Sequence, residues 1–246
     1  MTSNKLIIGL AALSLSVSIA QADNLELGLV IDGSGSIDAT EFATQKNGYI
    51  AALTNPAIIP ADGTVTVGIW QFSGTASGGA LYITDVLAPL TISSAADRAT
   101  MVAAVTAMTQ HSGAGTGWTA IGDAIIYAAD ELVAFGGGPD RRVIDVSTDG
   151  NQTAGVNDPD DASLFVMANR GVNAVNGLFV GDGIDSSWIQ PPGFKVTISS
   201  FDQFEPAIAG KIRREVQGAP DGGATVLLML GSLVGLLGAR RFTAAK

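Results

Sequence analysis

A chain of 246 residues without cysteine can form neither a disulfide nor a thiolate metal site. Its formal net charge of -10 at pH 7 disfavours nucleic acid and anionic lipid headgroups as partners, because both repel a negative surface. Between two apolar ends lie about 195 residues, which is enough for one domain of ordinary size.

The N-terminal end has the pattern of a secretory signal. Lys5 precedes an apolar stretch, Leu6 to Ile19, and a small-residue cleavage site follows at 20–22. We therefore expect residues 1–22 to be a signal peptide that directs the rest of the chain across the inner membrane. The alternative is a buried N-terminal helix.

Strand-like and helix-like segments alternate along residues 24–216. Six segments are expected to be strands: 25–31, 64–72, 81–87, 142–147, 172–180 and 195–199. Several are apolar almost throughout, as parallel strands buried on both faces are. Five helices are expected: 38–53, 95–108, 121–135, 161–170 and 204–216. This order predicts a single α/β domain with a doubly wound, mostly parallel central sheet flanked by helices.

Two of the helices carry explicit boundary signals. Asp38 with Glu41 three residues later forms a capping box at the start of the first helix. Three consecutive glycines, 136–138, end the apolar stripe of the third. These signals mark the end of the loop before the first helix and the start of the loop after the third.

Oxygen-bearing side chains gather in three of those loops. The first strand ends at Asp32, followed by Ser34 and Ser36, and a later strand leads to Asp149. Thr119 follows a glycine-rich segment just before the third helix. Carboxylates and hydroxyls suit a hard divalent cation. In doubly wound sheets, ligands bind at the carboxyl ends of the strands, where both acids are expected.

The Asp-x-Ser-x-Ser sequence with a distant Thr and a distant Asp resembles the metal-ion-dependent adhesion site of the von Willebrand factor A (vWA) family. The likeness extends over residues 24–216, and its last part is similar to an uncharacterised bacterial subfamily of these domains. It implies one bound cation, Mg²⁺ with Mn²⁺ or Ca²⁺ as alternatives, and five ligating residues: Asp32, Ser34, Ser36, Thr119 and Asp149.

The resemblance also implies a role for each of these residues. Asp32 holds the ion and orients its loop, while Ser34 and Ser36 bind the ion directly. Thr119 binds directly or through water, and Asp149 acts through water or through hydrogen bonds to the ligands. An acidic side chain of a partner protein is expected to complete the coordination.

Three residues near this motif have simpler interpretations. His111, the single histidine, is expected to be a solvated loop residue. Trp118 is expected either to contact a partner or to act as a wedge that holds its loop. Asp123 lies where an acid favours the helix dipole, which is a better explanation than a metal role.

An acid inside an apolar strand, Asp145, needs a partner for its charge. Arg141, Arg142 or a backbone amide is expected to provide it, and Asp145 is interpreted as structural. Arg213 and Arg214 are expected to form a solvated helix face.

The C-terminal end contains a second apolar segment. Residues 217–223 form a linker with the motif Ala-Pro-Asp-Gly-Gly, residues 224–241 a transmembrane or sorting helix that ends in two arginines, and residues 242–246 a cytoplasmic tail. The arrangement resembles the Val-Pro-Asp-Ser-Gly type of sorting signal processed by exosortase-type enzymes in Gram-negative bacteria, with Ala219 and Gly222 at the two differing positions. It implies a cell-surface protein; the alternative is a plain membrane anchor.

The leading functional hypothesis is an extracytoplasmic module that binds or adheres to another protein through its metal. A structural surface protein with a fold-stabilising metal is the second. A metal-dependent hydrolase is the third and least favoured, because no Gly-x-Ser-x-Gly motif surrounds Ser34 or Ser36 and His111 belongs to no recognisable triad. We therefore expect no enzymatic activity.

Overall fold

The computed structural model describes residues 24–111 and 116–218. The predicted signal peptide, the sorting motif and the apolar C-terminal segment lie outside these residues. Within them, no helix has the length and apolar character needed to cross a membrane.

The described chain forms the expected α/β domain. Its elements, in chain order, are β1 (Leu25–Asp32), α1 (Ala39–Thr54), β2 (Val65–Gly74), β3 (Leu81–Thr91), α2 (Ala95–Ala107), α3 (Ile121–Phe135), β4 (Arg141–Thr148), α4 (Pro159–Asn169), β5 (Ala174–Val180), β6 (Lys195–Ile198), the 3₁₀ turn η1 (Phe201–Gln203) and α5 (Phe204–Gln217). The predicted fold class is confirmed.

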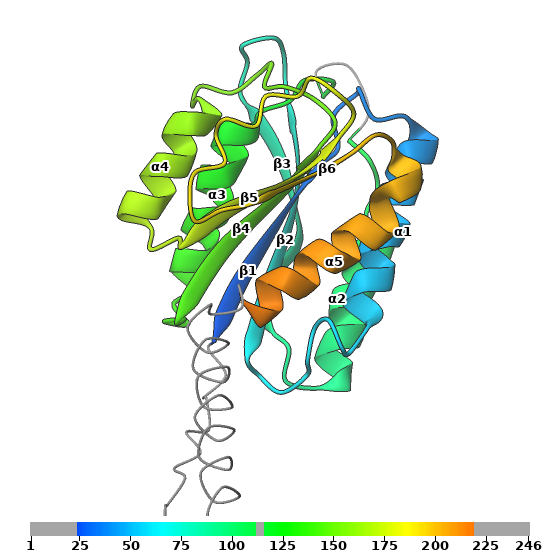
Figure 1. The fold of residues 1–246 in the computed structure, drawn as a ribbon, viewed down its shortest axis with the longest axis vertical. Helices are drawn as coiled ribbons and strands as arrows, with labels where there is room; N and C mark the ends of the chain where they lie inside the picture. The colour runs from blue at the N-terminus through cyan, green and yellow to red at the C-terminus, as the bar shows by residue number, and fades with distance from the viewer. Residues whose placement is uncertain (1–23, 112–115, 219–246) are drawn as a thin grey trace, which may run out of the picture.

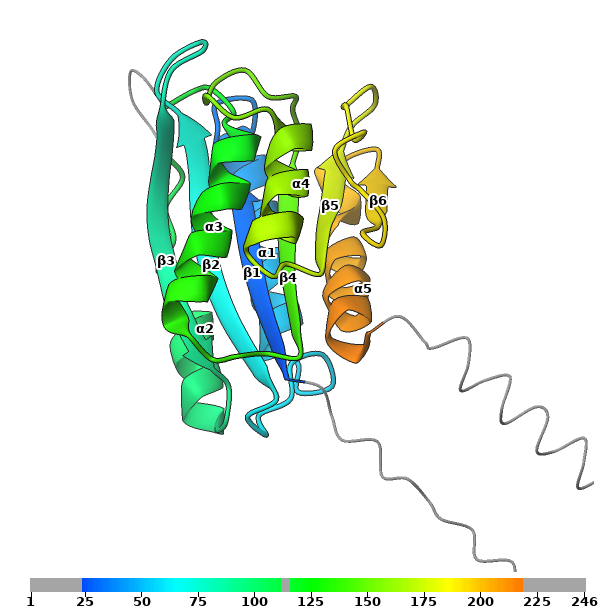
Figure 2. The ribbon, with the colours of Figure 1, turned by 90° about the vertical axis from the view of Figure 1, so that its left-hand side faces the viewer.

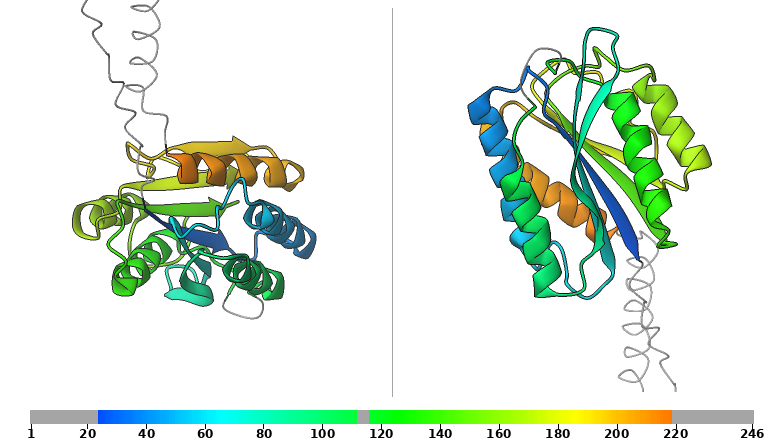
Figure 3. Two further views of the ribbon diagram at one scale, coloured as in Figure 1. Left: turned by 90° about the horizontal axis from the view of Figure 1, so that it is seen from below. Right: turned by 180° about the vertical axis from the view of Figure 1, so that it is seen from behind.

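The six strands form one sheet in the order β3-β2-β1-β4-β5-β6. All neighbouring strands run parallel except β3, which is antiparallel to β2 at the sheet edge. Helices α3 and α4 cover one face, and α1, α2 and α5 cover the other (Figure 1, Figure 2). The view from below in Figure 3 shows the three layers.

Each face of the sheet has its own apolar core. Leu27, Leu29 and Ile31 of β1 point toward α1, α2 and α5, while Val30 packs on the α3 and α4 side. Every residue of β1, β2 and β5 is buried, because the central strands are covered on both faces. The two cores fix the strand ends in space.

The predicted boundaries agree with the structure within a few residues, and the largest difference is at the sheet edge. Strand β3 continues to Thr91, four residues beyond the predicted end at 87, and its exposed and half-buried residues show that it is not covered like the central strands. Helix α4 begins at Pro159 instead of 161, because Asp158 caps it through the Asp160 backbone N–H. The capping box of Asp38 and Glu41 is confirmed.

The topology brings distant loops to one end of the molecule. Strands β1 and β4 are neighbours with Ile31 opposite Ser147, so Asp32 at the end of β1 lies beside Thr148 at the end of β4. At the other end of the sheet, Arg141 donates a hydrogen bond from its backbone to Asn24 and from its side chain to the last turn of α5. The described chain therefore starts and ends at the edge opposite these loops (Figure 1).

Candidate metal centre

Asp32 is the buried anchor of the candidate site. It has no exposed surface, and each of its carboxylate oxygens accepts one hydrogen bond. The backbone N–H of Ser34 donates to Oδ1 at 2.8 Å, and the hydroxyl of Thr148 donates to Oδ2 at 2.6 Å. The carboxylate is therefore fixed between the loop that follows β1 and the end of β4.

A chain of hydroxyl groups joins the remaining residues. The Ser34 and Ser36 hydroxyls share a hydrogen bond of 3.1 Å, and Thr119 donates to Ser34 Oγ at 3.2 Å. Ser36 donates to Asp149 Oδ1 at 2.6 Å, across 113 residues of sequence. The structure thus brings all five residues named from the sequence motif into one cluster.

Backbone contacts place the Thr119 loop against the Ser34 loop. The Gly35 N–H donates to the Gly117 carbonyl at 3.2 Å, and a Cβ atom on Gly35 would lie 3.1 Å from the Gly117 Cα. Glycine makes this close approach possible without any shift of the Gly117 backbone. Thr153 accepts from the Thr119 backbone N–H at 2.9 Å, which holds the threonine in register.

Burial raises the pKa of both acids in the cluster. The pKa of Asp32 rises from 3.8 to about 6, mainly because burial removes water from the carboxylate; the hydrogen bonds from Thr148 and Ser34 oppose the rise. The pKa of Asp149 is also raised, first by burial and then by the charge of Glu41. None of the ion pairs in the described part of the chain involves either acid.

These features suit a divalent cation with oxygen ligands. Neighbouring ligands in an octahedral Mg²⁺ site lie about 3.0 Å apart, given metal–oxygen distances of about 2.1 Å. The hydroxyl oxygens of Ser34, Ser36 and Thr119 already have this spacing, at 3.1 and 3.2 Å. A positive ion would also offset the unfavourable burial of Asp32. The donor set therefore fits the group that the sequence motif implies.

The fit depends on the hydroxyl groups. Among the residues that the structure describes, no group of three or more His, Cys, Asp or Glu side chains is placed to hold a metal ion. The cluster has two acids, and its other donors are neutral. This composition favours a hard cation over zinc-type nitrogen and sulfur coordination.

Three residues that support the cluster were missed in the sequence. Thr148 bonds directly to Asp32, and Gln45 on α1 donates to the Asp32 carbonyl at 2.9 Å. Gln110 donates to the carbonyls of Ile37 at 2.6 Å and Ser34 at 3.3 Å. Strand register would have found Thr148, because it lies opposite Asp32; no sequence signal marks the two glutamines.

His111 lies in a loop as predicted, but it is not a solvated residue. The ring is half-buried and bonds to two hydroxyls, with Ser73 Oγ 2.9 Å from Nδ1 and Thr84 Oγ1 2.9 Å from Nε2. Burial lowers its pKa from 6.5 to about 4, so the ring is neutral near pH 7. Its partners lie on β2 and β3, not in the hydroxyl cluster.

The predicted partners of Asp145 are also wrong. The fully buried Asp145 forms an ion pair with Lys211 of α5. Arg142 instead pairs with Glu26, and Arg141 binds carbonyls at the end of α5. The long lysine side chain reaches the sheet from a helix 66 positions further along the chain.

The other candidates have structural contacts. Asp123 lies in the first turn of α3 as expected, and it also accepts hydrogen bonds from the backbone of Val156 at 2.9 Å and of Asn157 at 3.0 Å. Trp118 pairs with Gly74 through its backbone, and 40% of its surface is exposed. Its side chain is thus available on the surface beside Thr119. Arg213 and Arg214 are exposed as expected.

The fold is that of vWA domains. Solved structures with the same fold include a von Willebrand factor type A domain from Catenulispora acidiphila (TM-score 0.57, 17% identity, 79% of this chain and 43% of that one). The family described as "Protein of unknown function (DUF1194)" matches residues 22–220, so the chain belongs to this family. No curated protein matches the chain.

Two further proteins share the fold. Proximal thread matrix protein 1 from the mussel byssus, in a structure with a zinc-occupied metal-ion-dependent adhesion site, has a TM-score of 0.60 at 22% identity, covering 79% of this chain and 46% of that one. The pilus adhesin SpaC from Lactobacillus rhamnosus GG has a TM-score of 0.55 at 15% identity, covering 79% and 30%. This chain spans less than half the length of the solved proteins that it matches.

Proposed function

We propose that this protein is an extracytoplasmic, metal-dependent module that binds another protein and has no enzymatic activity. The observation that carries the proposal is the convergence of one carboxylate–hydroxyl cluster from three separate loops at the carboxyl edge of the sheet. Its members, proposed as the metal site, are Asp32, Ser34, Ser36, Thr119 and Asp149. The zinc-occupied site of the mussel matrix protein, on the same fold, supports this assignment.

Each residue has a role set by its position. Asp32, Ser34 and Thr119 are buried, so they would hold the ion from below and exclude water from its inner side. Ser36 is exposed and Asp149 half-buried, so the cluster opens to solvent on their side. A bound Mg²⁺, or Mn²⁺ or Ca²⁺ in its place, would supply a Lewis-acidic position at that opening. An acidic side chain of a partner protein is the ligand that such a position favours.

The same cluster lacks the imidazole base of a serine-type hydrolase. The ring nitrogens of His111 are engaged by Ser73 and Thr84, so no imidazole is available to activate a hydroxyl of the cluster. Ser36 donates to Asp149, which belongs to the proposed cation site and would act there through water or through this hydrogen bond. Binding is therefore better supported than turnover.

The position of the site, at the edge opposite the end of α5, suits a surface protein. The candidate metal edge lies opposite the edge where α5 ends at Gln217 (Figure 1). If residues 224–241 anchor or sort the chain, as their composition suggests, the metal edge would face away from the membrane. An exosortase-type enzyme is the processing partner proposed for the 217–223 motif.

The test is capture of proteins from an envelope extract by the purified domain, in Mg²⁺ and in EDTA, alongside calorimetric titration with Mg²⁺. We expect saturable Mg²⁺ binding and a captured protein that EDTA releases. Capture that survives EDTA would refute the proposed mode of binding. If EDTA lowers the unfolding temperature and leaves every interaction unchanged, the metal is structural instead.

A further inference from the structure

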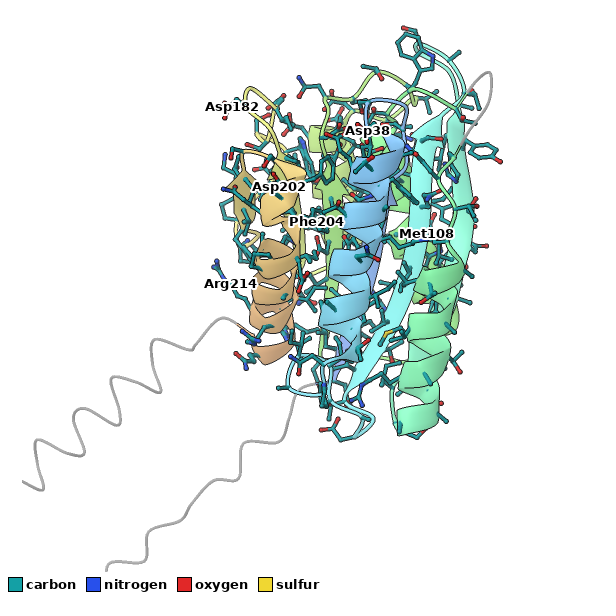
Figure 4. The ribbon with its side chains drawn as sticks, turned by 90° about the vertical axis from the view of Figure 1, so that its right-hand side faces the viewer. Asp38, Met108, Asp182, Asp202, Phe204 and Arg214 are labelled. Atoms are coloured by element: carbon teal, nitrogen blue, oxygen red, sulfur yellow. The ribbon has the colours of Figure 1, made fainter. Side chains whose placement is uncertain are left out.

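Three ionisable side chains meet in the interior between strand β4 and helix α5. They are Asp145 of β4 and Lys211 and Glu215 of α5, and none has any exposed side-chain surface. Lys211 forms an ion pair with Asp145, and its Nζ lies 2.7 Å from Glu215 Oε1. Phe204 and Arg214, labelled in Figure 4, mark the first residue and the last turn of the helix that carries Lys211. The lysine amine is therefore held in contact with both acids.

The space around the lysine is closed to solvent and bordered by aromatic rings. Its Nζ lies 5.5 Å from the centre of the Phe194 ring, and Arg214 covers the same ring at 3.7 Å. Tyr49 faces the same acids, since burial and then the charge of Asp145 raise its pKa well above its ordinary value. Charges are costly in such a place, and transfer of one proton from the amine to the carboxylate leaves two neutral groups.

A neutral amine held against a carboxylic acid is the reactant pair for an amide bond. The Lys211 Nζ is the nucleophile, and the Asp145 Cγ is the carbon that it would attack. Because folding holds the two groups in contact, the reaction needs no bimolecular encounter. Amide formation releases one water molecule, and a site that excludes water disfavours the reverse reaction.

Glu215 is placed to transfer the protons that this reaction requires. Burial, and then the charge of Asp145, raise its pKa to about 8, so the carboxyl carries a proton near pH 7. Its Oε1 accepts hydrogen bonds from Lys211 at 2.7 Å and from Asn176 Nδ2 at 2.8 Å, which fix the carboxyl group. In the described part of the chain, Glu215 Oε2 and Asp145 Oδ2 are buried without a hydrogen-bond partner. A proton shared between these two oxygens would satisfy both.

We propose that Lys211 and Asp145 become joined by an amide bond between Nζ and Cγ, with Glu215 as the acid and base for the step. The neutral amine adds to Cγ of the protonated Asp145 while Glu215 donates its proton to the carbonyl oxygen. Glu215 then takes a proton from the nitrogen and passes it to one hydroxyl, which leaves as water. It regains its own proton from the other hydroxyl, which becomes the amide carbonyl.

The step is balanced without a further reactant. One C–N bond forms, one C–O bond breaks, one water molecule is lost, and nothing is oxidised or reduced. The structure describes the chain before this reaction, with the ion pair between Lys211 and Asp145 intact. Burial is the largest cause of the raised pKa of Glu215, and it remains after the bond has formed.

The bond would join the central sheet to the last helix of the domain. It would link positions 66 residues apart, and Asp145 lies four residues before Asp149 of the proposed metal cluster. A pull on the C-terminal end of α5 would then reach that cluster through a covalent path, without unfolding the helix. This consequence rests on the proposed metal-dependent function, whereas the bond itself does not.

The test is the intact mass of the purified protein, measured under denaturing conditions. We expect a mass lower, by one water molecule, than the mass that its residues require. Trypsin should yield residues 143–170 linked to residues 196–213, with no cleavage after Lys211. A full mass would overturn the proposal, and so would loss of one ammonia molecule with Asn176 as the linked residue. Mg²⁺ plays no part in the measurement, so its outcome is independent of the proposed metal site.

Three variants assign the roles within the step. Lys211→Met removes the nucleophile and Glu215→Gln removes the proton transfer, so both should keep the full mass. Glu205→Gln, exposed in the first turn of the same helix, is the matched control and should lose one water molecule as the parent does. Circular dichroism checks that all three fold. Loss of water in Lys211→Met would overturn the bond, and linkage in Glu215→Gln as complete as in its control would overturn the role of Glu215.

Discussion

Two groups of buried acids lie on neighbouring parts of the sheet, and they satisfy their charge in different ways. The first group is Asp145 on β4 and Glu215 on α5. Together with Lys211 of α5 these two acids form the charge cluster, and all three side chains are fully buried. Lys211 lies 2.7 Å from Glu215 and also pairs with Asp145. The second is the metal cluster around Asp32, whose acids are in none of the described ion pairs.

The difference separates a self-contained structural cluster from the cluster proposed as the metal site. In the charge cluster the cation belongs to the chain, so folding itself delivers it and no opening to solvent is needed. In the metal cluster the chain supplies acids and hydroxyls only, and the exposed Ser36 leaves one side open. A buried acid without a cation of its own, beside an open edge, therefore points to a cation taken from solution.

The largest effect is expected from removing the built-in cation. Lys211→Met would leave the buried Asp145 without a counter-charge and remove the hydrogen bond from Lys211 to Glu215, which costs about 3–5 kcal/mol of unfolding free energy. Urea unfolding followed by circular dichroism measures this loss. Lys195→Met, at an exposed position, is the control and should stay within about 0.5 kcal/mol of the parent protein. Equal stability of both variants would show that the charge cluster does not hold α5.

The matching change in the metal cluster is Asp32→Asn. It keeps the shape of the side chain and removes its charge, so the domain should stay folded while Mg²⁺ affinity falls by about 100-fold or more. Calorimetric titration measures the affinity. Asp202→Asn, at an exposed position in the η1 turn and labelled in Figure 4, is the control. Unchanged Mg²⁺ binding in Asp32→Asn would remove the basis of the proposed site.

The sequence predicted the architecture because its signals are local or periodic. Apolar strands, the capping box at Asp38 and the left-handed Gly136 at the end of α3 each depend on a few neighbouring residues. The position of Asp32 at a strand end followed from the same signals. The class of fold and the edge at which the candidate ligands meet were therefore predictable.

Side-chain pairing across the fold was not predictable. Asp145 was expected to pair with an adjacent arginine, but strand alternation and the packing of α5 bring Lys211 to it instead. His111 was expected in solvent, but the β3 hairpin covers it and supplies Thr84. Both errors have one cause: contacts between distant segments depend on packing, which the sequence pattern does not specify.

The charge cluster should also make stability depend on pH. Burial, and then the charge of Asp145, raise the pKa of Glu215 from 4.5 to about 8. Near neutral pH the folded protein therefore holds a proton that the unfolded chain has already lost. Unfolding free energy should therefore fall as the pH rises through this range. Between about pH 6.5 and pH 8.5 the loss should be at most about 2 kcal/mol.

Other titrations contribute less in this range. Tyr49 faces the same cluster, but its pKa is raised well above 10. The pKa of His111 is about 4 in the fold and 6.5 when unfolded, so His111 adds a small rise in unfolding free energy just above pH 6.5, and Asp32, with a pKa of about 6, adds a small fall. Glu215→Gln should remove most of the fall in the urea midpoint across this window, whereas Glu205→Gln, exposed in the first turn of α5, should keep the parent's slope. A parent protein without any slope would show that Glu215 is ionised in the fold.

The smallest expected effect concerns the open side of the metal cluster, where a partner would make contact. Trp118, next to Thr119 and 40% exposed, is the large apolar side chain placed to touch it. Trp118→Ser should weaken Mg²⁺-dependent capture from the envelope extract by about tenfold, the effect of losing one aromatic contact at an interface. Its Mg²⁺ affinity, measured by calorimetry, should not change, because no side-chain oxygen of the cluster is altered. Leu164→Ser, 53% exposed on α4, is the control and should leave capture intact. The charge cluster is sealed from solvent and the metal cluster is open, so only beside the metal cluster can a surface substitution change partner binding. If Trp118→Ser captures as much protein as its control, the partner approaches from another side.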